Sequence, residues 1–222
     1  EFGIPVLIVV EGWSAAGKGS MINKIIQPLD PRGFKVTCIA SPSQDEQLRP
    51  FLWRFWRRTP SAEKMAIFDR SWYRNLLDEV VDGNLSGKDL EKAYADIRSF
   101  ERQLRDSGTI IFKLFLDIPK KEQALRLEAL RKNPNTSWRV DDGVLARHYK
   151  YDEYKQASKA MFAETDVGDG AHWQEIDTTK FLPATAEVLD ILVSLLKNKV
   201  EKRKNGIKFN RNIPAAELPR FK

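Results

Sequence analysis

The chain has 222 residues, of which 31% are charged and 10% are aromatic, and its formal net charge at pH 7 is +6. Disordered chains carry fewer aromatic residues, and a chain of this length buries enough surface to fold without disulfides. The single cysteine, Cys38, and the two histidines exclude a disulfide framework and a metal site rich in either residue. No signal peptide and no apolar run of ~20 residues is visible, so we expect a cytoplasmic protein without a membrane partner. The positive charge suits a polyanionic partner, although solubility explains it equally well.

The predicted elements alternate between strand and helix along the chain. A β-branched run at 4–11 predicts a strand buried on both faces. A turn rich in glycine and alanine follows at 12–19, and an apolar face at 20–27 predicts a helix. Further strands are expected at 34–40, 65–69, 108–116 and 174–177, the last at a sheet edge, and further helices at 45–56, 90–105, 119–130, 145–163 and 185–197. This alternation predicts an α/β fold with a mostly parallel sheet.

Two segments are expected in the domain organisation. Residues 3–197 should form one domain. Residues 198–222 are basic and polar and contain Pro214 and Pro219. Such a composition is typical of a linker or a docking arm.

The turn after the first strand fits the pattern G-x-x-x-x-G-K. Its glycines let backbone N–H groups turn toward phosphate oxygens, the following helix adds its positive dipole end, and Lys18 reaches the terminal phosphates. A glycine-rich turn with a surface lysine is the alternative, but the place of the motif between a buried strand and an amphipathic helix favours a phosphate loop. The predicted phosphate-binding residues are Gly12, Ser14, Ala15, Ala16, Gly17, Lys18, Gly19 and Ser20.

The string FDRSWY at 68–73 is the second candidate element. Asp69 ends a predicted strand, and folds of this class bind ligands at the carboxyl ends of parallel strands. Beside a phosphate loop, Asp69 would hold Mg²⁺ directly or through water, and Arg70 would face the phosphates. Helix capping by Asp69 is the alternative, but capping does not explain why Arg70 follows it.

Basic residues recur through the middle of the chain. Arginine suits bidentate contact with phosphate, but solvated helical faces explain about half of these residues. The string FLWRFWRR at 51–58 combines them with aromatic residues. Stacking on nucleic acid would use such a string, but a helix packed on a sheet explains it better. We therefore expect no nucleic-acid partner.

Together these strings resemble the type-2 polyphosphate kinase family, phosphotransferases of the P-loop kinase class. The resemblance covers about residues 5–196, and it implies a P-loop kinase-like three-layer sandwich with a helical lid over about residues 120–163. The strings that carry it are EGWSAAGKGS at 11–20, FLWRFWR at 51–57, FDRSWY at 68–73, FERQLRDSG at 100–108, FKLFLDIPKKEQALRL at 112–127, SWRV at 137–140 and YDEY at 151–154.

The resemblance also implies a reaction, which is transfer of a phosphoryl group between inorganic polyphosphate and a nucleoside mono- or diphosphate with Mg²⁺ as cofactor. AMP or ADP is the expected nucleotide, and polyphosphate would run along a basic channel. Residue by residue, the resemblance assigns catalysis to Lys18, Asp69 and Arg70, metal binding to Asp69, and phosphate contacts in the lid to Lys121 and Arg126. Because members of the family often associate, we expect a homo-oligomer.

The chain departs from the family pattern at two positions. Members usually carry aspartate where this chain has Ser14, and often an acidic residue where it has Val144. A serine hydroxyl is a poorer Mg²⁺ ligand than a carboxylate, so a slow or inactive domain is expected. Some members are tandem fusions whose halves need not both be active, and the basic tail resembles the exit from the N-terminal half of such a fusion.

Two functions follow, and both stay open at this point. The first is a polyphosphate-dependent nucleotide kinase. The second is a catalytically degenerate domain that binds polyphosphate or supports an active partner domain, such as a second kinase-like domain. An ordinary ATP-dependent kinase is a third alternative.

Overall fold

The computed structural model describes residues 3–166 and 171–204. Within them, five parallel strands form one sheet in the order β2-β3-β1-β4-β5. The strands are β1 (Val6–Gly12), β2 (Phe34–Cys38), β3 (Met65–Asp69), β4 (Ile110–Asp117) and β5 (Trp173–Asp177). Each predicted strand is present, with β5 at an edge, and the parallel α/β class is confirmed.

Strand β1 occupies the centre of the sheet because its side chains are apolar on both faces. Residues 6–10 are all buried. The strand pairs with β3 on one side, where Val10 is the partner of Asp69, and with β4 on the other, where Gly12 is the partner of Leu116. This register brings the loop after β1 and the end of β3 to the same edge of the sheet.

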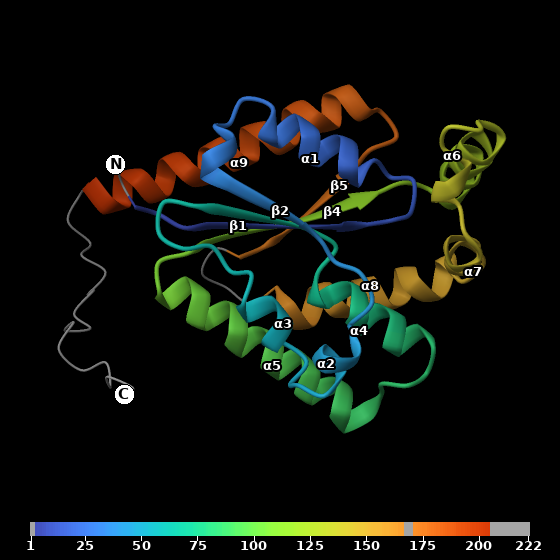
Figure 1. Cartoon of the computed structure of the whole chain (residues 1–222), viewed down its shortest axis with the longest axis horizontal. Coiled ribbons are helices and arrows are strands. Elements are labelled where there is room, and N and C mark those ends of the chain that lie inside the picture. Colours follow the sequence, from blue (N-terminus) through green and yellow to red (C-terminus); the bar gives the residue numbers. More distant parts are fainter. Residues whose placement is uncertain (1–2, 167–170, 205–222) are drawn as a thin grey trace.

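Helices cover both faces of the sheet (Figure 1). On one face lie α1 (Lys18–Ile26) and α9 (Phe181–Lys204), and on the other lie α4 (Trp72–Val81), α5 (Gly87–Asp106) and α8 (Tyr151–Thr165). The short helices α2 (Gln44–Gln47) and α3 (Trp53–Trp56) lie on the same side as α4. This arrangement confirms the predicted three-layer sandwich.

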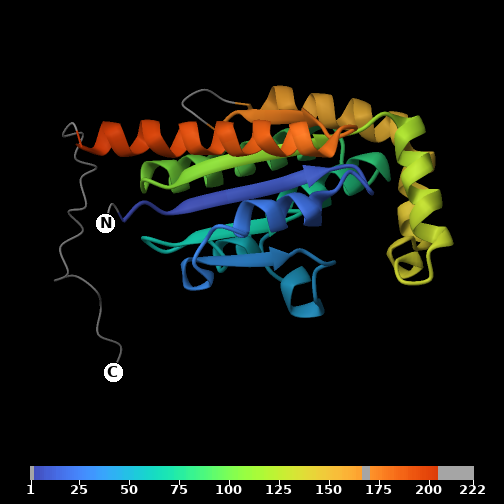
Figure 2. The same cartoon turned by 90° about the horizontal axis from the view of Figure 1, so that it is seen from above.

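Two helices stand beyond the carboxyl edge of the sheet. These are α6 (Lys120–Lys132) and α7 (Asp142–Tyr149), and the 3₁₀ turn η2 (Ser137–Arg139) joins them. A second 3₁₀ turn, η1 (Pro31–Gly33), precedes β2. Figure 2 shows α6 lying across the end toward which β1 points. We call residues 120–149 the lid segment.

Several helices differ from the sequence prediction. The expected helix at 45–56 is divided into α2 and α3, because Pro50 lies between them and cannot continue a helix. The expected helix at 145–163 is divided at Lys150, because α7 stays with the lid segment while α8 packs against α4 and α5. Helix α4 lies outside the predicted elements, although the Ser71 side chain caps its first turn.

The last helix is longer than predicted. Helix α9 begins at Phe181 and continues to Lys204, so residues 198–204 of the expected basic arm are helical. Residues 205–222 of that arm lie outside the described residues. Across the two described ranges, no helix combines the length and the apolar character that crossing a bilayer requires.

Candidate functional site

The loop between β1 and α1 has the backbone of a phosphate loop. Gly12, Ala15 and Gly17 have positive φ angles of 126°, 63° and 95°. A Cβ at Gly12 would lie 2.2 Å from the Leu116 carbonyl oxygen, so only glycine fits where β1 passes β4. Ala15 holds a left-handed conformation that costs energy for a residue with a side chain. Such turns direct successive N–H groups toward one point, which is the geometry that binds phosphate.

Lys18 opens α1 and folds its ammonium back over this loop. Its Nζ donates to the carbonyl oxygens of Gly12 at 2.9 Å and Trp13 at 2.8 Å. Burial lowers the pKa of Lys18 to about 8, and the nearby Arg70 adds to the effect while Asp69 opposes it. A bound anion would favour the charged amine and raise this pKa again.

Strand β3 delivers Asp69 and Arg70 to the neighbouring position. The N–H of Arg70 donates to the Val10 carbonyl at 3.0 Å, which ties the end of β3 to β1. Arg70 has a φ of 66°, an uncommon conformation for a residue other than glycine. The chain therefore turns directly after the strand, and both side chains line the same cleft.

That cleft, of about 880 Å³, lies between the phosphate loop and the lid segment. The charged residues that line it are Lys18 at the start of α1, Asp69 and Arg70 at the end of β3, and Arg126 and Arg139 from the lid segment. In the described part of the chain, four cationic groups thus face one carboxylate. Low-dielectric walls with one predominant sign of charge attract a polyanion and exclude most cations.

Most of the predicted site residues meet at this cleft. Those that line it are Ser14, Ala15, Gly17, Lys18, Gly19, Ser20, Asp69, Arg70 and Arg126. Gly12 lies behind the loop, and Ala16 is buried with its carbonyl accepting from Thr178 Oγ1 at 2.9 Å. Lys121 is exposed on α6 and does not line the cleft.

Arg126 does more than line the cleft. Its guanidinium donates to the carbonyl oxygens of Thr178 at 2.9 Å and Ala15 at 3.4 Å. It also pairs with Glu122 at 2.7 Å. In this conformation Arg126 therefore fastens the lid segment to the phosphate loop and to the end of β5.

The donor set fits a divalent cation that is held mainly by bound phosphates. Among the described residues, no group of three or more histidine, cysteine, aspartate or glutamate side chains is arranged to hold a metal. Asp69 is the one carboxylate among the residues that line the cleft, and Ser14 and Ser20 offer hydroxyls. Mg²⁺ binds well to one or two carboxylates together with substrate phosphates and water. Ser14 and Val144, the two departures from the family pattern, both line this cleft.

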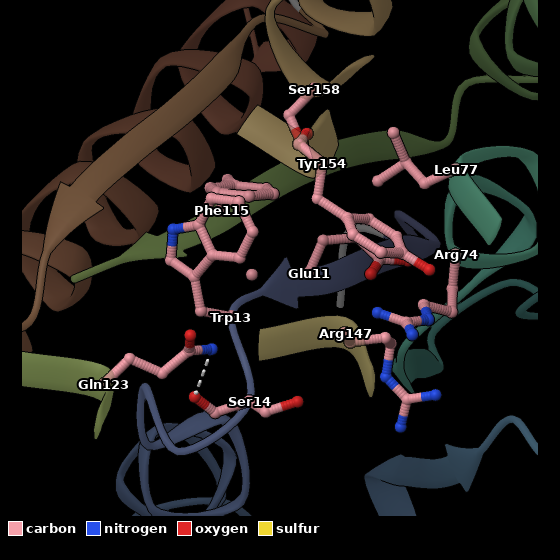
Figure 3. A pocket seen from close by; sticks show the side chains of 11 residues that line it. Glu11, Trp13, Ser14, Arg74, Leu77, Phe115, Gln123, Arg147, Tyr154 and Ser158 are labelled. Carbon is pink, nitrogen blue, oxygen red and sulfur yellow. Dashed lines mark hydrogen bonds between the residues drawn. The ribbon is translucent and has the colours of Figure 1, made fainter. Parts of the chain in front are cut away.

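Sequence reasoning missed the residues that hold the phosphate loop from behind. Gln123 is buried on α6, and its Nε2 donates to the Ser14 carbonyl at 3.2 Å (Figure 3). Its Oε1 is 2.6 Å from Nδ1 of His148 on α7. Trp13 stacks on Tyr151 with ring centroids 4.2 Å apart. A tryptophan inside a loop of small residues was the available signal, whereas nothing in the sequence distinguishes Gln123.

Comparison with known proteins agrees with this geometry. Residues 1–204 match the family model for polyphosphate kinase 2. A polyphosphate:AMP phosphotransferase from Acinetobacter johnsonii is 39% identical over 192 residues, which are 86% of this chain and 40% of that protein. An AMP/ADP-polyphosphate phosphotransferase from Meiothermus ruber is 34% identical over 191 residues, which are 86% of this chain and 71% of that protein.

A solved structure shows the same fold. The crystal structure of polyphosphate kinase 2 from Arthrobacter aurescens TC1 matches with a TM-score of 0.84 and 32% identity, covering 88% of this chain and 69% of that chain. The chain spans about two-fifths of the length of the Acinetobacter relative and a similar share, 37%, of the one from Pseudomonas syringae pv. tomato.

Proposed function

Because this chain belongs to the polyphosphate kinase 2 family, we propose that it catalyses Mg²⁺-dependent transfer of a phosphoryl group between inorganic polyphosphate and a nucleoside mono- or diphosphate. The observation that carries the proposal is the cleft, where a phosphate loop and four cationic side chains face a single carboxylate. AMP or ADP is the proposed nucleotide, since the names of the relatives include these two.

Phosphoryl transfer depends on positioning and charge neutralisation, and it needs no nucleophile from the protein. Lys18 would exchange its bonds to the Gly12 and Trp13 carbonyls for bonds to phosphate. Arg70 would neutralise charge on the phosphates beside Lys18, and Asp69 would hold Mg²⁺. When bound, Mg²⁺ would offset charge on the donor and acceptor phosphates as they approach.

Two further features belong to the proposal. A second kinase-like domain is the proposed partner, since the match covers only 40% of the Acinetobacter relative. The cytoplasm is the proposed compartment, because a single free cysteine, Cys38, suits a reducing environment.

The test is the initial rate of transfer to AMP and to ADP, with polyphosphate or ATP as the donor. We expect transfer that depends on polyphosphate and Mg²⁺ and that Lys18→Ala abolishes. Lys24→Ala removes an equal charge from an exposed position on α1 and should leave the rate unchanged. Transfer from ATP alone would instead indicate an ordinary kinase. Binding of polyphosphate without transfer from either donor would indicate a degenerate domain.

A further inference from the structure

A buried carboxylate stands directly before the phosphate loop. Glu11 precedes Gly12, the first glycine of the loop, and Glu11 is only 2% exposed. It does not line the cleft, and Figure 3 shows it beside a small pocket behind the loop. A buried carboxylate destabilises a fold unless it is paired or hydrogen-bonded, so the partner of Glu11 indicates what it does.

The hydrogen-bond partner of Glu11 is Ser71, two residues beyond Asp69. Ser71 Oγ donates to Glu11 Oε1 at 2.7 Å, and Ser71 is fully buried. The same hydroxyl accepts from the Tyr73 N–H at 3.2 Å and so caps α4. Burial raises the pKa of Glu11, and the hydrogen bond from the Ser71 side chain is the largest effect that opposes this shift. The end of β1 therefore holds the first turn of α4.

Arg70 lies next to this contact in a conformation that needs support. Its φ of 66° is left-handed, and a residue with a side chain keeps such a conformation only where its surroundings fix it. Before the turn, the Arg70 N–H donates to the Val10 carbonyl at 3.0 Å. After the turn, the Ser71 hydroxyl donates to Glu11. Two consecutive residues of β1 thus hold the turn from both sides.

We propose that Glu11 is a positioning residue that fixes the Asp69–Arg70 turn relative to the phosphate loop through the Ser71 hydroxyl. Lys18 from the loop and Arg70 from the turn line the same cleft, so their relative placement would set the rate of transfer. The effect on the rate rests on the proposed function, whereas the hold on the turn does not.

Hydrogen exchange of the Arg70 amide, followed by NMR on the whole chain, tests the hold on the turn. Ser71→Ala removes the donor to Glu11. The amide should then exchange at least about tenfold faster, because its bond to the Val10 carbonyl opens more often.

Thr165→Val is the matched control, because it removes a similar hydroxyl from a place outside the cleft. Thr165 is 1% exposed, and its Oγ1 donates to the Met161 carbonyl at 2.6 Å and accepts from Trp173 Nε1 at 3.0 Å. This variant should lower the melting temperature about as much as Ser71→Ala does. It should leave exchange of the Arg70 amide and kcat unchanged.

Steady-state kinetics with polyphosphate and AMP test the effect on the rate. Ser71→Ala should lower kcat at least about tenfold, since a misplacement of about 1 Å costs roughly 100-fold. KM for polyphosphate should change less than about threefold, because every charge that lines the cleft is kept. Glu11→Gln keeps an oxygen that accepts from Ser71 and should retain more of kcat than Glu11→Leu.

The double variant Glu11→Leu with Ser71→Ala completes the cycle. Both changes remove the same hydrogen bond, so the double variant should be no slower than the slower single variant. Rate losses that multiply would show that the two residues act separately and would overturn the coupling. Should Glu11→Leu fail to fold, Ser71→Ala and Glu11→Gln decide the question.

The remaining outcomes separate the hold on the turn from the proposed function. Unchanged exchange of the Arg70 amide in Ser71→Ala overturns the hold. Faster exchange with unchanged kcat overturns the positioning role, because the contact then serves the fold alone. An unmodified chain that transfers nothing from polyphosphate overturns the proposed function and with it the effect on the rate, and the exchange measurement still decides whether Glu11 holds the turn.

Discussion

Lys18 donates to two backbone carbonyls, which would compete with a bound phosphate for its ammonium. Because burial lowers the pKa of Lys18 to about 8, part of the population loses this proton in mildly alkaline solution. The carbonyls accept from the neutral amine as well, but an anion binds the protonated form far more strongly. Binding of phosphate at the proposed site would thus be coupled to protonation of one side chain.

We therefore expect affinity for tripolyphosphate to fall as the pH rises through about 8, and to level off below it, where Lys18 is already charged. Near pH 8, binding should take up protons, which calorimetry in buffers of different ionisation enthalpy measures. Lys18→Arg stays protonated throughout and serves as the control for titration of the ligand itself. Equal proton uptake by both proteins would contradict the coupling.

A second prediction at the level of single residues concerns Ser14. Asp69 is the one carboxylate among the described residues that line the cleft, so Ser14→Asp would supply a second ligand for Mg²⁺. A misplacement of about 1 Å costs roughly 100-fold in rate, so better placement of the ion should raise turnover by about tenfold or more. The Mg²⁺ concentration that gives half-maximal rate should fall. Initial rates against Mg²⁺ measure both quantities.

The control adds the same charge elsewhere. Ser61→Asp lies at an exposed position outside the cleft and should change neither quantity. If Ser14→Asp leaves the Mg²⁺ dependence unchanged, the hydroxyl is no handicap to this domain.

At the scale of elements, α6 positions the phosphate loop through Gln123. Gln123→Leu keeps the size of the side chain but removes the hydrogen bonds to the Ser14 carbonyl and to His148. We expect kcat to fall at least about tenfold through misplacement of the loop, and the free energy of unfolding to fall by about 1–3 kcal/mol. Gln103→Leu, at an exposed site on α5, should affect neither. Unchanged kcat would show that α6 only covers the loop.

The layers are joined by a buried ion pair. Lys113 of β4 is 0% exposed, and its Nζ lies 3.0 Å from Glu101 of α5 and 2.8 Å from the Thr165 carbonyl at the end of α8. Burial raises the pKa of Glu101 and lowers the pKa of Lys113, while their mutual attraction opposes both shifts.

Breaking this pair should be costly, because it leaves one buried charge alone. Lys113→Met should lower the free energy of unfolding by about 3–5 kcal/mol, and adding Glu101→Leu should recover part of the loss. Chemical denaturation of the two variants measures this. A double variant less stable than Lys113→Met would show that Glu101 stabilises the fold even without its partner Lys113.

The sequence predicts those parts of the site that lie in contiguous segments better than those that depend on how distant helices are placed. The phosphate loop and the Asp69–Arg70 pair are contiguous strings after apolar runs, so their meeting at one sheet edge followed from parallel strands. The contacts of Gln123 with Ser14 and His148 depend on where α6 and α7 stand, and that depends on the helix break at Lys150. No periodic pattern encodes such a break, since both flanking segments favour helix.

At the scale of the whole molecule, the described lining of the cleft carries more positive than negative charge. The Debye length is about 10 Å at 0.1 M salt, so added salt screens the several phosphates of a long ligand from these groups. Binding of long polyphosphate should weaken with salt more steeply than binding of AMP. Titrations at low and high salt measure the two slopes, and Arg139→Gln should reduce the slope for polyphosphate. Equal slopes would indicate that the lid bases do not contact polyphosphate.

The charged groups of the cleft would contact phosphates, and polyphosphate is a string of identical ones. On the proposed function, sliding such a ligand along the cleft by one unit would restore every contact with Lys18, Arg70, Arg126 and Arg139, so no register would be preferred. Affinity per molecule then grows with the number of equivalent registers. A tenfold longer chain gains at most about 1.4 kcal/mol from this degeneracy, once the cleft is filled. The interior of a polyphosphate chain would therefore bind in many equivalent registers, and only a contact with a chain end would make one register unique.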